Sequence, residues 1–353
     1  MREIKLRHDA GLYLFAGPVN YRLRFLAVSL LPFLLILGCG RGGKQQEIVY
    51  VSAPQTFLRD RVATIYTKTG VVKNGDKLQV LERDRRFARV RTEDGSEGWV
   101  EQRNLVSQQV FDGFQKLSQE AQNLLPQSSG VTRNDTNLHL TPGRDTEHLY
   151  QLNRDSKVSL LKRDVAEKPG MTAPAKATPD QKGSPAKPVL EDWWLIRDSS
   201  SRCGWVLGRM IDVDIPLEVA QYAEGQRIVA FFILDQVTDG DHKVPQYLVL
   251  LNENKDGMPF DYGQVRVFTW NVKRHRYETA YRERNLNGIL PVTVAQESFD
   301  KEGTLPTFTL RVKDDNGATR ERKYKLNTPI VKRVLAPGEE KQAPIARQKQ
   351  RKQ

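Results

Sequence analysis

The chain has 353 residues, with 55 Lys and Arg against 43 Asp and Glu, so its formal net charge is +12, and it contains only two cysteines. This length allows two or three small domains, and two cysteines exclude a fold held together by a framework of disulfides. The positive charge favours anionic partners such as carboxylate-bearing polymers or lipid headgroups.

A short apolar run lies near the N-terminus. Residues 25–37 (FLAVSLLPFLLIL) are apolar apart from Ser29 and Pro32, and five Lys or Arg precede them. A membrane-spanning helix needs about 20 apolar residues, so this run is short for an anchor and suits the apolar core of a secretory signal. A plain membrane anchor followed by an incidental cysteine is the alternative.

The run ends in LLILGC, residues 34–39, where a branched apolar residue stands three positions before Cys39 and a glycine stands one position before it. This motif resembles the lipobox of bacterial lipoproteins. The resemblance implies removal of residues 1–38 as a signal peptide, multiple acylation of Cys39, a polar tether over 39–49, and anchorage in the bacterial cell envelope on the periplasmic side. Gly40, in place of an aspartate, favours the outer membrane.

Processing at Cys39 also limits the possible partners of the protein and the role of its other cysteine. Residues 1–38 carry five Lys or Arg and two acidic residues, so the remaining chain keeps a charge of +9. Location, rather than charge, then argues against nucleic acid as a partner. Cys203 would be left as a free cysteine, and with no histidine near it in the sequence we expect a strand-end residue and not a catalytic thiol.

Short strands separated by turns are predicted over residues 50–106. Gly75-Asp76 and Asp94-Gly95 are turn signals, and apolar and polar residues alternate around them. Strands of about five residues at such spacing predict a small antiparallel barrel. Together with Phe57-Leu58-Arg59 and Gly98-Trp99-Val100, this pattern resembles a bacterial SH3-like domain.

The pattern occurs twice. Lys77–Leu81 matches Lys157–Leu161, and Gly98–Val100 matches Gly204–Val206, the offset growing from 80 to 106 residues between the two matches. The repeat predicts a second SH3-like domain over 131–215 with an insertion over 165–190. Because that insertion is rich in Pro, Ala, Lys and Gly, we expect it to be disordered.

A helix is predicted in the connector, residues 107–130. Val110, Phe111, Phe114 and Leu117 fall at helical spacing, and Ser107 is a suitable N-cap. We expect this helix to pack against a neighbouring barrel, and a helix that binds a partner is the alternative.

By resemblance, bacterial SH3-like domains bind peptidoglycan or peptides and carry no chemistry of their own. An exposed aromatic surface would serve that purpose. The candidate ligand-binding residues are Tyr50, Phe57, Tyr66, Phe87, Trp193 and Trp194. Strand alternation places Trp193 and Trp194 on opposite faces, so we expect one in the core and the other more exposed. Core packing competes with ligand binding for each candidate, and we expect Trp99 and Trp205 to pack in the barrels.

Residues 217–335 are predicted to form a β-rich domain, a sandwich or barrel-like fold that resembles no family we can name. Asp315-Asn316-Gly317 is a strong hairpin signal. Asp235, Asp239 and Asp241 suit a cation, although a solvated turn is the favoured interpretation. Lys273–Arg276 suits an anionic glycan or lipid, with a charged hairpin tip slightly favoured. Residues 336–353 are predicted to be a basic disordered tail.

Catalysis finds little support in the sequence. The five histidines lack metal-ligand spacing, and no nucleophile elbow, phosphate loop or cysteine–histidine pair occurs. We therefore expect a mainly β protein of two SH3-like barrels, a helix and a C-terminal β domain, without enzymatic activity, metal or cofactor. It would bind peptidoglycan or an envelope protein while lipid-anchored to a membrane. The alternatives are a divergent cell-wall enzyme with activity in 217–335 and a structural subunit of an envelope assembly.

Overall fold

The computed structural model describes residues 46–172, 188–300 and 302–335. The apolar run, Cys39 and the tail 336–353 lie outside the described residues, and so do the predictions made for them. Within the described ranges, no helix is both long enough and apolar enough to cross a membrane. All described strands belong to one unit of the chain, which begins at Glu47.

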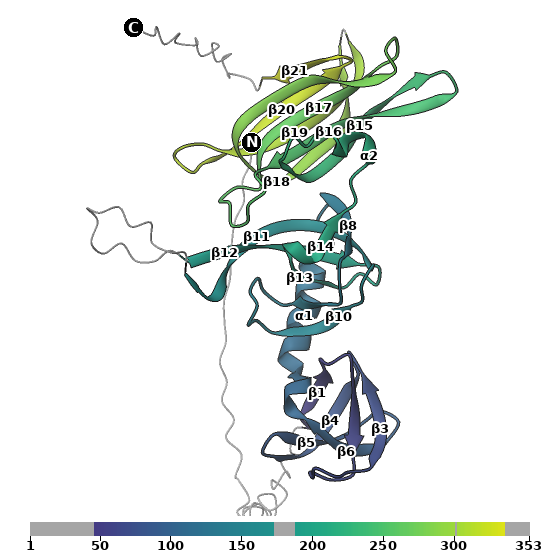
Figure 1. The fold of residues 1–353 in the computed structure, drawn as a ribbon, viewed down its shortest axis with the longest axis vertical. Coiled ribbons are helices and arrows are strands. Elements are labelled where there is room, and N and C mark those ends of the chain that lie inside the picture. Colours follow the sequence, from purple (N-terminus) through teal and green to yellow (C-terminus); the bar gives the residue numbers. More distant parts are fainter. Residues whose placement is uncertain (1–45, 173–187, 301, 336–353) are drawn as a thin grey trace, which may run out of the picture. The chain divides into compact units, whose positions relative to one another are not determined.

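Three antiparallel sheets of seven strands each make up the fold. Each sheet is built from one consecutive stretch of chain, as the change of colour from purple through teal to yellow shows (Figure 1). The prediction of a mainly β protein is therefore confirmed.

The first sheet has the strand order β3-β2-β6-β5-β4-β1-β7. Its strands are β1 (Ile48–Val51), β2 (Gln55–Arg59), β3 (Lys68–Lys73), β4 (Lys77–Asp84), β5 (Phe87–Arg91), β6 (Glu97–Glu101) and β7 (Leu105–Ser107), with the short helix η2 (Gln102–Asn104) before β7. Alternation buries one face, where Leu58, Ala88 and Val100 are at most 1% exposed. Gly98 is required there because a Cβ would lie 2.7 Å from the Leu58 Cβ.

The second sheet repeats the strand order of the first, as β10-β9-β13-β12-β11-β8-β14. Its strands are β8 (Ser128–Thr132), β9 (Thr136–His139), β10 (His148–Leu152), β11 (Lys157–Thr172), β12 (Pro188–Asp198), β13 (Cys203–Leu207) and β14 (Ile211–Val213), with η3 (Gly208–Met210) before β14. The two sheets therefore share one topology.

Part of the predicted insertion is ordered. β11 and β12 continue their antiparallel pairing beyond the region common to both sheets, with Val165 opposite Asp192, Glu167 opposite Leu190 and Thr172 opposite Pro188. The prediction of disorder over 165–190 is thus wrong at both ends, because a Pro- and Lys-rich composition does not prevent backbone pairing between strands that are already adjacent. Residues 173–187 lie outside the described residues.

Helix α1 (Gln108–Ala121) connects the first two sheets. The Ser107 side chain accepts a hydrogen bond from the Val110 N–H at 3.4 Å and so caps the helix. Phe111 stacks on Tyr50 of β1, with ring centroids 4.0 Å apart. Phe114 is fully buried and meets Tyr150 of β10 edge-on at 5.5 Å. The helix therefore packs against both sheets.

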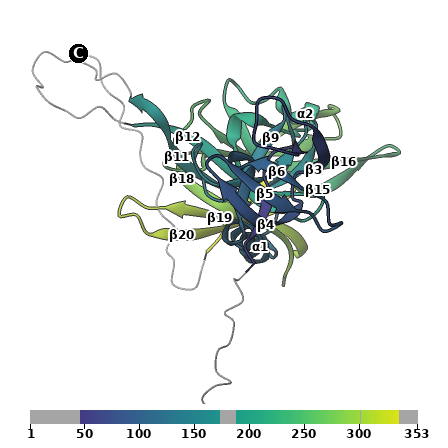
Figure 2. The same cartoon turned by 90° about the horizontal axis from the view of Figure 1, so that it is seen from below.

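The third sheet is an up-and-down meander in which consecutive strands are neighbours. Its strands are β15 (Arg227–Asp239), β16 (His242–Asn252), β17 (Tyr262–Asn271), β18 (Arg276–Phe299), β19 (Gly303–Lys313), β20 (Thr319–Asn327) and β21 (Ile330–Val334). The hairpins β15–β16 and β19–β20 project from the sheet in both views (Figures 1 and 2).

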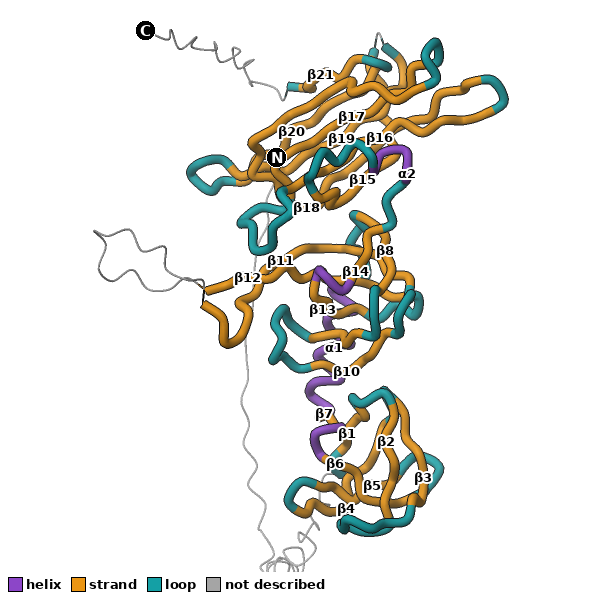
Figure 3. The backbone as a smooth tube through the Cα atoms, in the orientation of Figure 1, coloured by secondary structure: helices purple, strands orange, loops and turns teal. Residues whose placement is uncertain are grey.

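Both faces of this meander are partly covered. One face buries Leu250, Tyr262 and Phe308, and the other buries Val249 and Phe268 beneath the short helix α2 (Leu217–Ala220) and the segment that follows it. The tube coloured by secondary structure shows how little helix the described chain contains beside its strands (Figure 3).

Candidate functional site

The outer face of the first sheet carries aromatic side chains that its core does not use. Along β2, β5 and β6, one set of side chains points inward and the alternate set outward, where Phe57, Phe87 and Trp99 are half-buried. Arg59 lies opposite Trp99 in the register of β2 and β6, so both side chains are on this outer face.

Arg59 holds this face together. Its guanidinium carbon lies 4.2 Å from the ring centroid of Tyr66 and 5.2 Å from that of Phe87. One of its nitrogens donates to a Glu101 carboxylate oxygen at 2.9 Å. The guanidinium contacts both ring faces and is itself held by its ion pair with Glu101. Together these contacts hold the Tyr66 and Phe87 rings in place.

Lys68 adds a second cation, its Nζ lying 3.8 Å from the ring centroid of Phe57. We call the set Phe57, Arg59, Tyr66, Lys68, Phe87 and Trp99 the aromatic face. A hollow of about 420 Å³ adjoins it, lined among others by Phe87, Glu101 and Arg103. In the β2–β3 loop, Ile65 is 87% exposed. The face thus offers rings, apolar surface and fixed positive charges to a ligand.

Three of the six predicted ligand-binding residues belong to this face, namely Phe57, Tyr66 and Phe87. Tyr50 does not, because it is 5% exposed, stacks on Phe111 and donates its hydroxyl to Gln108 Oε1 at 3.0 Å. It is a core residue between the first sheet and α1.

Trp193 and Trp194 are 2% and 7% exposed, so the expectation that one of them would be more exposed is wrong. Trp194 lies in the core of the second sheet. Trp193 faces outward, but it is covered in a cluster that includes Leu161 and Ala121, the last residue of α1. Alternation gives the direction of a side chain and does not show what covers it.

Trp99 was expected to pack in the barrel, and the structure instead places it on the aromatic face. Glu97 and Glu101, which share its side of β6, are charged. Charged residues at alternate positions are the sequence signal for an outward-facing side of a strand. Trp205, the matching residue in the repeat, is 6% exposed, but it lies with Trp193 in the covered outward-facing cluster and not in the barrel core.

The second sheet has no open counterpart of the aromatic face. His139 takes the place of Arg59, since it lies opposite Trp205 as Arg59 lies opposite Trp99. The His139 ring is 5.1 Å from that of Trp193. Burial, helped by His148, lowers the pKa of His139 to about 4, so this histidine is neutral at pH 7 and supplies no cation.

Cys203 is fully buried, and burial raises the pKa of its thiol. Its backbone N–H donates to Ser118 Oγ of α1 at 3.0 Å. This environment is that of a packing residue and not of an activated nucleophile.

The two polar clusters of the third sheet lie at neighbouring hairpin ends. Asp239 accepts from Trp270 Nε1 at 2.7 Å and pairs with His275 Nδ1 at 2.6 Å, and these hydrogen bonds lower the pKa of Asp239. Arg274 and Arg276 both pair with Glu278. Across the described ranges, no group of three or more His, Cys, Asp or Glu is placed to hold a metal ion.

Comparisons with known proteins agree with the geometry of the first sheet. Residues 55–106 match the bacterial SH3 domain family, so this stretch is a bacterial SH3 domain. A comparison with curated proteins gives no match.

Among solved structures, the chain is similar to an NlpC/P60 family protein from Bacillus cereus ATCC 10987, at 10% identity and a TM-score of 0.23, covering 54% of this chain and 65% of that one. It is also similar to NlpC2 from Trichomonas vaginalis, at 10% identity and a TM-score of 0.17, covering 79% and 97%. NlpC1 from the same organism gives 9% identity and a TM-score of 0.16, covering 69% and 91%. TM-scores this low carry no argument about function.

Proposed function

We propose that this protein is a non-enzymatic, lipid-anchored component of the bacterial cell envelope that binds peptidoglycan through its SH3 domain. The observation that carries the proposal is the aromatic face, where Arg59 and Lys68 lie against half-buried rings. Rings pack against sugars and peptide stems, and a guanidinium or ammonium group pairs with the carboxylates of those stems.

We further propose that residues 50–106 and 131–215 are tandem SH3-like domains and that 217–335 is a separate β-rich domain. The common strand order of the first two sheets supports the repeat. In the second sheet, the position equivalent to the aromatic face is covered. We therefore assign ligand binding to the first domain and a structural role to the second.

Purified sacculi test the binding. We expect the Phe57→Ala/Trp99→Ala variant of the full chain to sediment with sacculi at least about tenfold more weakly than wild type, since central aromatic contacts dominate such interfaces. Phe299→Ala is a matched control, because Phe299 also lies against a lysine, with Lys325 Nζ 4.2 Å from its ring centroid, but on the third sheet. We expect this control to bind like wild type.

Three outcomes would contradict the proposal. Unchanged sedimentation of the double variant would remove the aromatic face from binding, and the absence of wild-type sedimentation would favour a protein partner or a structural role in an envelope assembly. Release of soluble muropeptides that depends on residues 217–335 would favour the divergent cell-wall enzyme.

The anchor rests on the sequence motif at Cys39 and has its own test. We expect cells supplied with an alkyne-labelled fatty acid to transfer the label to the wild-type chain and not to Cys39→Ser, and we expect the variant to migrate as the longer, unprocessed precursor. Cys203→Ser is the control and should keep the label. Equal labelling and mobility of wild type and Cys39→Ser would refute lipidation, together with the periplasmic, outer-membrane location that we propose from it.

A further inference from the structure

A three-residue bulge interrupts the pairing of β17 and β18. Tyr262 lies opposite Gly288 and Gln264 opposite Arg284, so the single residue Gly263 faces the three residues 285–287. Bulges of this kind redirect side chains and are enriched beside binding sites.

Two features fix the bulge. Asn285 has φ of +57°, in the left-handed region that asparagine tolerates better than most residues. Gly288 must be glycine, because a Cβ there would lie 2.1 Å from the Tyr262 ring. The bulge is therefore built into the local sequence.

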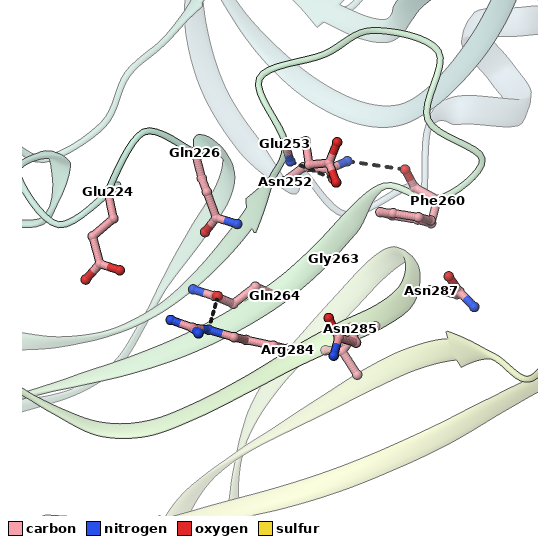
Figure 4. A pocket seen from close by; sticks show the side chains of 11 residues that line it. Glu224, Gln226, Asn252, Glu253, Phe260, Gly263, Gln264, Arg284, Asn285 and Asn287 are labelled. Carbon is pink, nitrogen blue, oxygen red and sulfur yellow. Dashed lines mark hydrogen bonds between the residues drawn. The ribbon is translucent and has the colours of Figure 1, made fainter. Parts of the chain in front are cut away.

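A pocket of about 500 Å³ opens beside the bulge (Figure 4). Five primary amides line it, those of Gln226, Asn252, Gln264, Asn285 and Asn287, and the Phe260 ring forms part of another wall. Amides both donate and accept hydrogen bonds. The lining thus combines groups that both donate and accept hydrogen bonds with one flat apolar surface.

Gln264 is oriented for this pocket. It is 4% exposed, and its Oε1 accepts from Arg284 Nε at 3.0 Å. Its Nε2 is buried without a hydrogen-bond partner among the described residues, and in Figure 4 this nitrogen points away from Arg284, toward the side lined by Glu224 and Gln226. Such an unpaired donor is costly to bury and favours an acceptor brought by a ligand.

Three charged residues line the pocket, Glu224, Glu253 and Arg284, and Glu224 is paired within the protein. Glu224 accepts from Arg266 at 2.8 Å and from Arg282 at 3.0 Å. A second hollow of about 550 Å³ shares residues 284–287 with the pocket and continues toward the β19–β20 hairpin. The two hollows together suit an extended ligand.

We propose that this amide-lined pocket binds a sugar chain that carries acetamido groups. Hydroxyl and acetamido groups match the donors and acceptors of the lining amides, and the Phe260 ring packs against a sugar ring. The proposal goes beyond the SH3 domain and does not depend on the aromatic face, since the pocket lies on the third sheet.

The probe is a tetramer of N-acetylglucosamine, titrated calorimetrically into the full chain. Asn285→Gly/Asn287→Ala removes two amides while glycine keeps the positive φ at position 285. We expect binding to weaken at least about tenfold, as for the loss of two neutral hydrogen bonds. The exposed Asn134 provides a control, and Asn134→Ala should bind like wild type.

The Phe57→Ala/Trp99→Ala variant separates this inference from the proposed function, because it should bind sacculi more weakly than wild type and bind the tetramer like wild type. Matching thermal unfolding of the variants excludes misfolding as the cause. Three results would overturn the inference: no binding of the tetramer by wild type, equal binding by Asn285→Gly/Asn287→Ala, or a stem peptide that occupies the pocket in place of the sugar.

Discussion

Replacing Arg163 with methionine is expected to destabilise the protein by about 3–5 kcal/mol, the usual result of removing one partner from a buried ion pair. The Arg163 side chain is 4% exposed and that of Asp192 is 3% exposed. One Arg163 nitrogen donates to Asp192 at 2.6 Å, and another donates to Asp261 and to the Phe260 carbonyl, both at 3.1 Å. Methionine fills similar volume but leaves both carboxylates without this cation.

The effect should depend on pH. Burial raises the pKa of Asp192, but hydrogen bonding to Arg163 and its charge outweigh burial, so the net pKa is lowered. Burial dominates at Asp261 and raises its pKa. A lowered folded-state pKa adds stability above the unfolded value, about 4, and that stability is lost as the pH falls through the folded value. The part of the Arg163→Met penalty that comes from Asp192 should therefore shrink as the pH falls below about 4 toward the lowered pKa of Asp192. The part that comes from Asp261 should already shrink above about pH 4, because the pKa of that carboxyl is raised.

Urea unfolding of the full chain measures the penalty, and Arg133→Met is its control. Arg133 pairs with Asp212 on the surface, the two side chains being 56% and 51% exposed. An exposed pair contributes about 0–1 kcal/mol. Equal losses for the two variants would show that the Arg163 network is not buried in solution.

Phe114→Ala should also cost about 3–5 kcal/mol, the range for truncating a buried phenylalanine. Phe114 extends from α1 into the core of the second sheet, where it is fully buried with Leu138 and Leu149 and lies edge-on to Tyr150. The substitution leaves a cavity that these rigid neighbours fill only in part. Calorimetric or urea-induced unfolding measures the loss.

Phe57→Ala is the matched control, because Phe57 lies on the aromatic face and is only half-buried. We expect a loss below about 1 kcal/mol, with the effect appearing in binding instead. If Phe114→Ala were as mild as Phe57→Ala, α1 would not be a packing helix, and the alternative of a partner-binding helix would return.

Arg163 and Phe114 lie in the parts of the fold that hold the proposed sites in place. Arg163 extends from β11 to the segment that carries Phe260, and Phe260 forms a wall of the amide-lined pocket. Asn74, in the β3–β4 turn of the SH3 domain, donates to the Leu149 carbonyl of β10 at 2.6 Å. Arg163 contacts the segment next to the pocket, whereas the SH3 domain is joined to the second sheet through other residues such as Asn74. Loss of the Arg163 network should therefore affect the pocket more than the aromatic face.

Local sequence pattern predicted much of this fold because strands and turns leave local signals. The glycine-containing turns predicted the first barrel, which matches the bacterial SH3 family, and the repeated Gly-Trp-Val predicted a second copy. The second sheet has the same strand order as the first. Phe57, Tyr66 and Phe87 were also predicted for the ligand-binding surface, and they do lie on the aromatic face.

The features that the sequence pattern did not predict depend on contacts between residues distant in the chain. Trp193 and Trp194 differ in direction, as alternation requires, but both are covered, one of them in a cluster with the end of α1. Trp99 is half-buried because no element among the described residues covers the outer face of the first sheet in the same way. The pocket required a register shift between β17 and β18, which no local pattern specifies.

The sequence by itself determined the strand-rich class and the bacterial SH3 domain, and it carries the motif at Cys39 from which we propose export, because each is encoded in neighbouring residues. Only the tertiary structure decided which aromatic residues face solvent, where Arg163 is buried and where five amides meet. Those properties depend on which distant segments cover one another, and burial of a side chain is a property of the whole packing arrangement.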